Sequence, residues 1–367
     1  MDPSSAFLFV QCQRGAEAAL KRAVTASHPG LRPAYQRPGL VTFRSRASVT
    51  PDVQLDCPLA RVFGVSLGTF ADAQAAAQHV GTLPQPLRLH VSELDLYRPD
   101  EAPPAHDAAA LAAAIETQLR AAVGGGFQAE VAASVGDLVL DVLVAPGDPL
   151  LLGLHRHTAG RSPLPGGRYD YVMPAAVPSR AYRKIEEAIA AFDLPLVAGD
   201  CALELGAAPG GAAYALLRRG VRVVGVDPGA MDPHVLAFEG PSAARLQHLQ
   251  QPMAAIGKRD LPEQVDWLLL DVHLAPQVAL RAASRFASLY RRTLLGAVLT
   301  LKLNDWAFLD DLPRFLRQAQ ELGLQKPRAL QLPAHRQELC IAGCTALGER
   351  RRSAQRQAGA RPGRGSD

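Results

Sequence analysis

The sequence predicts an α/β domain with a mainly parallel sheet in the C-terminal half of the chain, preceded by two small α+β units. Two observations predict the α/β domain. Strand-like and helix-like segments alternate from residue 179 onward, and a glycine-rich turn joins the first of these strands to the next helix. The 367 residues are about twice what one hydrophobic core organises, which predicts two or three domains in all.

The composition excludes several other classes of protein. Apolar residues make up 48% and charged residues 20%, as in a globular protein and unlike a disordered or collagen-like chain. No apolar run reaches about 18 residues, so no transmembrane helix is expected. The first residues lack a basic region ahead of an apolar stretch, so no secretory signal is expected. The five cysteines lack CxxC spacing, which predicts reduced thiols in a cytoplasm and no zinc site.

The charges are unevenly distributed. The chain carries a net charge of +4, and the stretch from Arg350 to Asp367 holds six arginines and one acid. The rest of the chain therefore holds 33 basic and 34 acidic side chains. Such a basic tail is either a solvated terminus or an arm that attracts phosphates, and we expect residues 349–367 to be disordered.

Lysine is rare in this chain. Of the 39 basic residues only five are lysines, at positions 21, 184, 258, 302 and 326. Arginine stays protonated in proteins, whereas lysine can lose its proton when its neighbours depress its pKa. Each lysine is therefore a candidate for proton chemistry.

The N-terminal part divides into two expected α+β units, residues 1–75 and 76–160. The expected elements are strands at 7–10, 39–43, 62–65, 87–91, 138–144 and 150–154, and helices at 15–26 and 107–123. His155 and His157 lie close together, but no third ligand candidate is near, so a surface or phosphate-facing pair is expected and not a metal site. A basic connector rich in proline and glycine is expected over 161–178.

The α/β domain is expected over residues 179–348. Its expected elements are helices at 179–192, 211–219, 278–289 and 309–322, and strands at 202–205, 221–226, 265–270, 296–303, 328–332 and 338–342.

The turn after the first of these strands is a candidate ligand site. It reads Leu-Gly-Ala-Ala-Pro-Gly-Gly over residues 205–211, and its small residues allow the backbone to approach a ligand. Ligands of parallel sheets bind at the carboxyl ends of the strands. Asp227 ends the next strand, 21 residues after Gly206, where an acid can hold ribose hydroxyls. The glycines do not fit the GxGxxG pattern of dinucleotide-binding folds, and a plain strand-to-helix turn is the alternative.

Four ionisable residues lie at element ends on what is expected to be one edge of the sheet. Asp271 follows an apolar strand, Lys302 closes a strand, Glu338 opens one, and Lys184 lies one turn into a helix. Each alone has an ordinary explanation, since lysines on helices are usually solvated and acids at strand ends often cap helices. Together they suit the removal of a proton from a weakly acidic sugar hydroxyl. A neutral lysine accepts the proton, cations nearby lower its pKa, and acids orient it.

The sequence around Asp271 argues against two classes of enzyme that methylate nucleobases. Asp271 is followed by Val272, His273 and Leu274, whereas many nucleobase amino methyltransferases have Pro-Pro-aromatic after the acid or amide. Cytosine C5 methylation needs a nucleophilic cysteine, and none lies in this region of the sequence.

Several segments resemble the FtsJ-like family of ribose 2′-O-methyltransferases that act on large-subunit ribosomal RNA. The segments are 178–188, the loop 205–211, 301–303 and His335-Arg336-Gln337-Glu338. The resemblance spans essentially the whole chain. It is weaker in the N-terminal part, where residues 9–15 and the middle unit are similar to ferredoxin-like and THUMP RNA-binding modules.

This resemblance implies a fold and an activity. It implies a Rossmann-like, S-adenosylmethionine-dependent methyltransferase domain preceded by ferredoxin-like and THUMP-like RNA-binding modules. The implied reaction is methylation of a cytidine 2′-hydroxyl in 23S ribosomal RNA, with no metal. The implied catalytic residues are Lys184, Asp271, Lys302 as general base, and Glu338. The implied cofactor contacts are Ser179, Gly206, Ala208, Pro209, Gly210, Gly211, Asp227 and Asp271.

The sequence departs from the family at two positions. The acid that usually faces the adenine near the third strand is missing from 249–253, where Gln251 is a substitute hydrogen-bond partner. Ala212 replaces the aromatic residue that commonly follows the glycine pair. Two rival functions stay open: the same chemistry on another RNA such as transfer RNA, and a non-catalytic RNA-binding protein that retains the fold. The intact set of four ionisable residues argues against the second.

Overall fold

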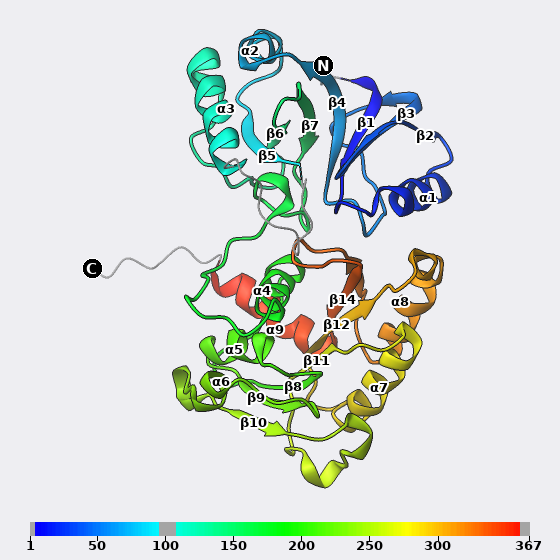
Figure 1. Ribbon diagram of the computed structural model, residues 1–367, viewed down its shortest axis with the longest axis vertical. Coiled ribbons are helices and arrows are strands. Elements are labelled where there is room, and N and C mark those ends of the chain that lie inside the picture. The colour runs from blue at the N-terminus through cyan, green and yellow to red at the C-terminus, as the bar shows by residue number, and fades with distance from the viewer. Residues whose placement is uncertain (1–3, 95–107, 360–367) are drawn as a thin grey trace, which may run out of the picture. The chain divides into compact units, whose positions relative to one another are not determined.

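The computed structural model describes residues 4–94 and 108–359 and divides the chain into two compact units, Met1–Asp170 and Tyr171–Asp367 (Figure 1). The division falls within the expected connector. No helix in the described part of the chain is long and apolar enough to cross a lipid bilayer.

The N-terminal unit is built on one seven-stranded sheet with the order β2-β3-β1-β4-β7-β6-β5. Among the described residues of this sheet, only β5 and β6 pair in parallel. The strands of the two expected α+β units share this sheet, because β4 pairs with β7. The elements are β1 (Ser5–Gln11), α1 (Glu17–Ser27), β2 (Leu31–Arg37), β3 (Leu40–Val49), β4 (Val62–Phe70), α2 (Ala73–Val80), β5 (Arg88–Glu93), α3 (Ala108–Val123), β6 (Leu138–Val144) and β7 (Leu150–Arg156).

Helices α2 and α3 cover one face of β5, β6 and β7. Leucines and valines of these strands pack there against Ala76 and Val80 of α2 and Leu119 of α3. The opposite face is also buried, and it carries polar side chains beside an apolar cluster that includes Leu143 and Leu151. His155 Nδ1 lies 2.5 Å from Asp141 Oδ2, and His157 is buried beside it. The expectation of a surface histidine pair is therefore wrong, because Asp141 on the neighbouring strand gives His155 a buried polar partner.

The C-terminal unit has a second seven-stranded sheet with the order β10-β9-β8-β11-β12-β14-β13. The five neighbouring strands β10, β9, β8, β11 and β12 are parallel, and β14 is antiparallel to both of its neighbours, β12 and β13. The elements are α4 (Ala181–Phe192), β8 (Cys201–Leu205), α5 (Gly211–Arg218), β9 (Arg222–Val226), α6 (Pro233–Ala237), β10 (Leu246–Leu249), β11 (Trp267–Asp271), α7 (Pro276–Leu289), β12 (Gly296–Lys302), α8 (Leu312–Glu321), β13 (Arg328–Leu330), β14 (Glu338–Cys344) and α9 (Ala346–Gly359).

Helices cover both faces of this sheet. Phe286 of α7 and Phe315 of α8 pack against alternate residues of the parallel strands, such as Leu203 and Leu268. Residues of α4 and α5 line a small buried space on the other face with Glu204 and Leu269. This three-layer arrangement is the Rossmann-like architecture that the alternation of strands and helices predicts.

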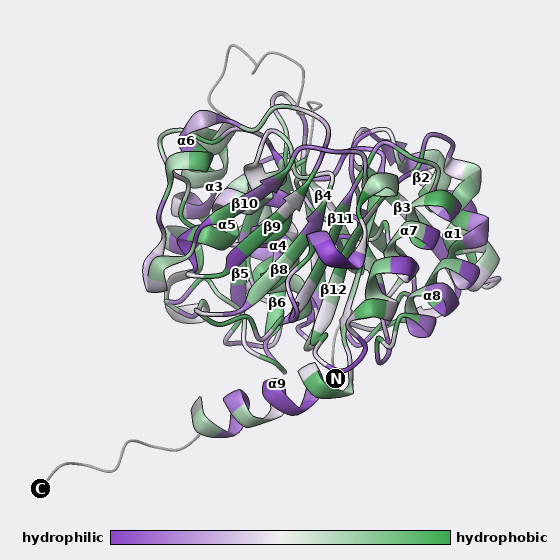
Figure 2. Cartoon of the chain, turned by 90° about the horizontal axis from the view of Figure 1, so that it is seen from below, coloured by the Kyte–Doolittle hydropathy of each residue, from purple (hydrophilic) through white to green (hydrophobic). Residues whose placement is uncertain are grey.

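Residues 346–359 correct the expectation that the tail is disordered from residue 349. They form α9, which alternates hydrophobic and hydrophilic residues along its length (Figure 2). Two arginines of this helix form ion pairs with the rest of the domain. Arg351 Nη1 donates to both carboxylate oxygens of Asp200 at 2.7 Å, and Arg356 Nε donates to Asp193 at 3.0 Å. These ion pairs and the helical backbone order the first part of the basic stretch.

Candidate active site

The turn between β8 and α5 brings its backbone unusually close to neighbouring elements. Gly206 has a φ of +86°, and a Cβ at this position would overlap the carbonyl oxygen of Asp271. Gly210 has a φ of +107°, and its Cβ would lie 2.6 Å from Met231 Sδ. A side chain at Gly211 would overlap the Ser179 hydroxyl ahead of α4. Only glycine fits these three positions, because the backbone of the turn packs tightly against Asp271, Met231 and Ser179.

Asp227 ties this turn to the end of β9. Its Oδ1 accepts a hydrogen bond from the Gly229 amide at 2.7 Å, and its Oδ2 accepts one from the Ala208 amide at 3.2 Å. The carboxylate is therefore fixed at the carboxyl edge of the sheet, beside the glycine-rich loop.

A cavity of about 430 Å³ opens at this edge. Most of the expected cofactor residues line it: Ser179, Gly206, Ala208, Pro209, Asp227 and Asp271. Gly210 and Gly211 are not among the lining residues and instead begin α5. The cavity is also lined by residues that were not predicted from the sequence, among them Arg180, Met253 and His273. Met253 lies near the position where Gln251 was expected to face the adenine, whereas Gln251 is exposed and does not line the cavity.

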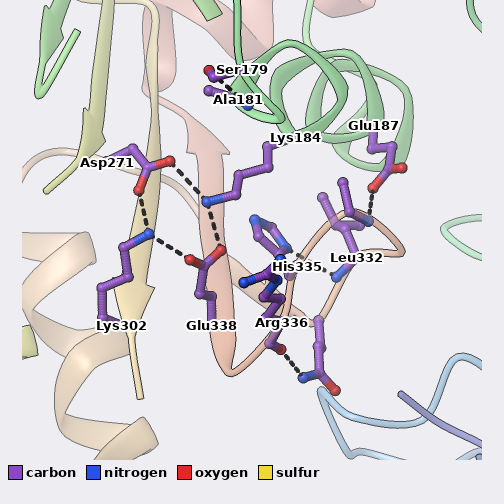
Figure 3. Close-up of polar contacts among 12 residues, drawn as sticks. Ser179, Ala181, Lys184, Glu187, Asp271, Lys302, Leu332, His335, Arg336 and Glu338 are labelled. Atoms are coloured by element: carbon purple, nitrogen blue, oxygen red, sulfur yellow. Dashed lines mark hydrogen bonds and ion pairs between the residues drawn. The ribbon is translucent and has the colours of Figure 1, made fainter. Parts of the chain in front are cut away.

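The four expected catalytic side chains meet in a closed ring at one end of the cavity (Figure 3). Lys184 Nζ lies 2.9 Å from Asp271 Oδ2 and 2.6 Å from Glu338 Oε2. Lys302 Nζ lies 2.8 Å from Asp271 Oδ1 and 2.5 Å from Glu338 Oε1. Each lysine therefore bridges both acids, and the charges alternate around the ring.

Strand direction explains how residues from four elements reach one point. Asp271 and Lys302 end the parallel strands β11 and β12. Glu338 begins β14, but β14 runs antiparallel, and its first residue is the register partner of Lys302. The start of this strand therefore lies at the same edge as the ends of the parallel strands. Helix α4 adds Lys184 from its first turns.

Burial and opposite charges compete in setting the pKa values of Lys302, Asp271 and Glu338. Burial lowers the pKa of Lys302, but Asp271 and Glu338 outweigh burial and raise the pKa above its ordinary value. For both acids burial raises the pKa, yet Lys184 and Lys302 bring the net pKa below its ordinary value. We expected neighbouring cations to lower the pKa of Lys302. The structure differs because two carboxylates contact its ammonium group directly, so Lys302 is protonated in the free protein.

A fifth ionisable residue, Glu204, lies beneath the ring. It is 2% exposed, and burial together with Asp271 and Asp227 raises its pKa well above the ordinary value. Burial and the two neighbouring acids therefore favour the protonated, uncharged form of Glu204. Its signal in the sequence is a charged residue within the apolar strand Leu203-Glu204-Leu205.

The described residues contain no cluster of three or more histidines, cysteines or acids that could hold a metal ion. The ring instead pairs acids with lysines, which are poor metal ligands when protonated. The side chains at this cavity are suited to proton transfer and charge stabilisation, next to the glycine-rich loop.

The C-terminal unit has a recognisable relative. Residues 177–303 match the sequence model of the FtsJ-like methyltransferase family. Residues 177–303 form an FtsJ-like methyltransferase domain. This segment contains the glycine-rich loop, Asp227, and three of the four ring residues. Methyltransferases of this family depend on S-adenosylmethionine.

Curated relatives share about half of the chain. It is similar to ribosomal RNA large subunit methyltransferase M of Marinomonas sp. (strain MWYL1), with 34% identity over 44% of this chain and 45% of the relative. The same enzyme of Laribacter hongkongensis is 33% identical over 52% of this chain and 55% of the relative. The match thus spans about half the length of these relatives. A solved structure, TrmN from Thermus thermophilus, aligns with 92% of this chain and 99% of its own at 16% identity and a TM-score of 0.34.

Proposed function

We propose that this protein is an S-adenosylmethionine-dependent 2′-O-ribose methyltransferase that acts on a cytidine of 23S ribosomal RNA. One observation carries the proposal: the ring of two lysines and two acids opens into the same cavity as the glycine-rich loop. The groups assigned to proton transfer and the loop assigned to the cofactor therefore line the same cavity. The similarity to ribosomal RNA large subunit methyltransferase M supports ribosomal RNA as the substrate class.

Residues at one side of the cavity fit the cofactor. Gly206, Ala208 and Pro209 of the loop line the cavity together with Asp227, so we assign the loop 206–211 and Asp227 to the adenosine and its ribose hydroxyls. Ser179, Ala208, Pro209 and Asp271 complete the assigned contacts. When bound, S-adenosylmethionine supplies the methyl group on a positively charged sulfur.

The ring residues handle the proton of the ribose hydroxyl. In this proposal Lys302 Nζ first loses a proton to solvent and would then accept the 2′-hydroxyl proton, while the methyl group would leave the cofactor sulfur for the ribose oxygen. Asp271 and Glu338 hold Nζ in place through their short contacts. The Lys184 ammonium group stabilises the negative charge that develops on the oxygen.

The N-terminal unit is assigned to RNA capture, with residues 1–75 as a ferredoxin-like module and 76–160 as a THUMP-like module. The strand register places Phe7, Arg44 and Arg32 in one row across β1, β3 and β2. All three are exposed, as is Tyr35 farther along the same face. Neither arginine has an ion-pair partner among the described residues. Exposed aromatic rings and free guanidinium groups on one sheet face suit stacking with unpaired bases and contact with phosphates.

Methyl transfer with defined RNAs tests the proposal. The full-length protein, labelled S-adenosylmethionine and unmodified 23S ribosomal RNA should give label on one ribose 2′-oxygen, read out by mapping of 2′-O-methyl sites. Transfer RNA serves as the competing substrate. Label on a base, label on transfer RNA alone, or no transfer to any RNA would each overturn the proposal.

A calorimetric titration tests the cofactor assignment separately. We expect S-adenosylmethionine to bind and a nicotinamide dinucleotide not to bind. Asp227→Ala should weaken the binding by roughly 1–3 kcal/mol, because the amides and hydroxyls that it pairs lose their acceptor.

A further inference from the structure

His335 lies in the turn between β13 and β14 and is completely buried beside the ring. Its Nδ1 accepts a hydrogen bond from the Leu332 amide at 3.2 Å (Figure 3). A nitrogen that accepts a hydrogen bond carries no proton, so the hydrogen of the neutral ring is on Nε2. Burial lowers the pKa of His335 to about 4, which keeps the ring neutral at pH 7. The structure thereby selects one tautomer, with an N–H on the side away from Leu332.

Two polar atoms without a hydrogen-bond partner lie on this side of the imidazole. His335 Nε2 has no hydrogen-bond partner among the described residues, although it is buried. Glu338 Oε2 contacts Lys184 Nζ at 2.6 Å but makes no hydrogen bond of good geometry. Figure 3 shows the imidazole next to the Lys184–Glu338 side of the ring, and Glu338 exerts the strongest charge effect on it. A buried donor without an acceptor is costly, which is unexpected in a turn with only a structural purpose.

We propose that His335 is a positioning residue whose Nε2–H donates to Glu338 Oε2 during the reaction and holds Glu338 against Lys302. The proposal rests on the proposed function of the ring. When Lys184 moves toward the substrate oxygen, Glu338 Oε2 loses its contact with the ammonium group. The imidazole N–H then replaces that contact with a neutral donor.

A neutral donor also affects the proton affinity of Lys302. The hydrogen bond takes up part of the negative charge on Glu338, so the carboxylate stabilises the Lys302 ammonium group less. The pKa of Lys302 is therefore lower with the imidazole N–H in place than without it. The other ionisable groups around the site are Lys184 and Glu187 on α4, Glu204 on β8, Asp271 on β11, Cys340 on β14 and Arg336 in the turn.

Two variants separate this contact from the Leu332 hydrogen bond. His335→Asn keeps an acceptor near the Nδ1 position and lacks the donor, whereas His335→Gln places an amide N–H near the Nε2 position. Both full-length variants are compared with the wild type by calorimetry with S-adenosylmethionine and by single-turnover methyl transfer as a function of pH. We expect S-adenosylmethionine affinity to be unchanged in both.

For His335→Asn we expect a methyl-transfer rate about 10-fold lower at neutral pH and a rate–pH curve displaced to higher pH. His335→Gln should retain most of the wild-type rate and the wild-type curve. The reverse ranking, or a slow His335→Asn variant whose rate–pH curve levels off at the same alkaline pH as that of the wild type, would reduce His335 to an anchor of the turn and overturn the proposal.

A measurement on the free proteins does not depend on methyl transfer. Nitrogen NMR of the histidine side chains should show His335 protonated at Nε2 only, as the proposed donor requires. A proton on Nδ1 contradicts the proposal even if the variants unfold. If the wild type transfers no methyl group to RNA, the proposed function fails, and the NMR result still decides whether His335 offers a donor at Nε2.

Discussion

At the scale of single residues, Lys302 carries a proton in the free protein that the proposed general base would have to lose. Lys302 is held as an ammonium group by Asp271 and Glu338, and these same acids keep its nitrogen in place. A base that is protonated at rest works only through its minor neutral form. In the proposed mechanism, the two acids thus fix the position of Lys302 Nζ, but they also reduce the fraction of Lys302 that is neutral and able to act as a base.

Exchanging each ring lysine for arginine separates charge from proton transfer. Lys302→Arg keeps the positive charge but stays protonated, so we expect single-turnover methyl transfer to fall by about 10²-fold or more. Lys184→Arg should be milder, because Lys184 is assigned an electrostatic effect only. Affinity for S-adenosylmethionine, measured by calorimetry, should stay nearly unchanged in both. A wild-type rate for Lys302→Arg would place the general base elsewhere.

The rate should depend on pH with a known sign. Because the pKa of Lys302 is raised, the neutral form is scarce at neutral pH and increases about tenfold for each pH unit. The logarithm of the single-turnover rate should therefore rise with a slope of about 1 from roughly pH 7 to 9, without a plateau. The Lys302→Arg variant should lose this slope. A flat wild-type profile would mean that Lys302 is not the titrating base.

The sequence predicts the ring better than its surroundings. Lysine is scarce, and Lys184, Asp271, Lys302 and Glu338 lie at element ends that a parallel sheet brings to one edge, so residue type and spacing suffice to select the candidates. The net pKa of Lys302 depends on contact distances and could not be predicted. The tautomer of His335 depends on a backbone amide in its own turn, which no residue pattern specifies.

At the scale of elements, the β8–α5 turn and β11 depend on each other. The backbone of Gly206 packs against the carbonyl group of Asp271, so the glycine-rich loop is in direct contact with the backbone of a ring residue. A change in the loop is therefore transmitted to the ring without any contact to substrate.

Gly206→Ala should disturb both functions. The added Cβ would overlap the Asp271 carbonyl at a left-handed φ, so we expect a loss of stability of about 2–4 kcal/mol together with weaker S-adenosylmethionine binding. Gly199→Ala is the matched control, because Gly199 has a φ of +92° with nothing within 4 Å of its Cβ. Urea unfolding and calorimetry measure both effects. Equal losses in the two variants would show that backbone strain alone matters.

Element prediction succeeded where apolar segments are long and failed where partners are distant. The strands of the C-terminal sheet lie close to their expected positions, because their apolar runs are bounded by turns. The edge strands β2 and β10 were missed because their residues are mostly polar or exposed. Helix α9 was missed because its partners Asp200 and Asp193 lie 151 and 163 residues before the arginines that they bind.

At the scale of the whole molecule, the proposal assigns RNA capture to the N-terminal unit and methyl transfer to the C-terminal unit. The row of Phe7, Arg44 and Arg32 is formed by three strands, so the sequence alone did not indicate that these residues are neighbours. The single seven-stranded sheet escaped prediction for the same reason, since the β4–β7 pairing joins residues far apart in the chain.

Replacing both arginines of this row with alanine should weaken RNA binding. If each guanidinium group contacts one phosphate, Arg32→Ala/Arg44→Ala should lower the salt slope of RNA binding by about two and the affinity about 10-fold or more. Filter binding at several salt concentrations measures both quantities. Arg259→Ala is the control. Arg259 is exposed and comes shortly before the first residue of β11, and that strand reaches the cavity only at its last residue. An unchanged slope in the double variant would remove this face from the RNA interface.

The burial of the ring lysines has a practical consequence for chemical labelling. Lys184 and Lys302 are 8% and 9% exposed, whereas Lys258 and Lys326 are exposed and Lys21 is half-buried. An amine-acylating reagent should therefore modify these last three side chains first and spare the ring pair. With so few lysines, a peptide mass map assigns every acylated position without ambiguity. The same map, recorded during incubation with ligands, would then report whether the ring opens to solvent as the protein works.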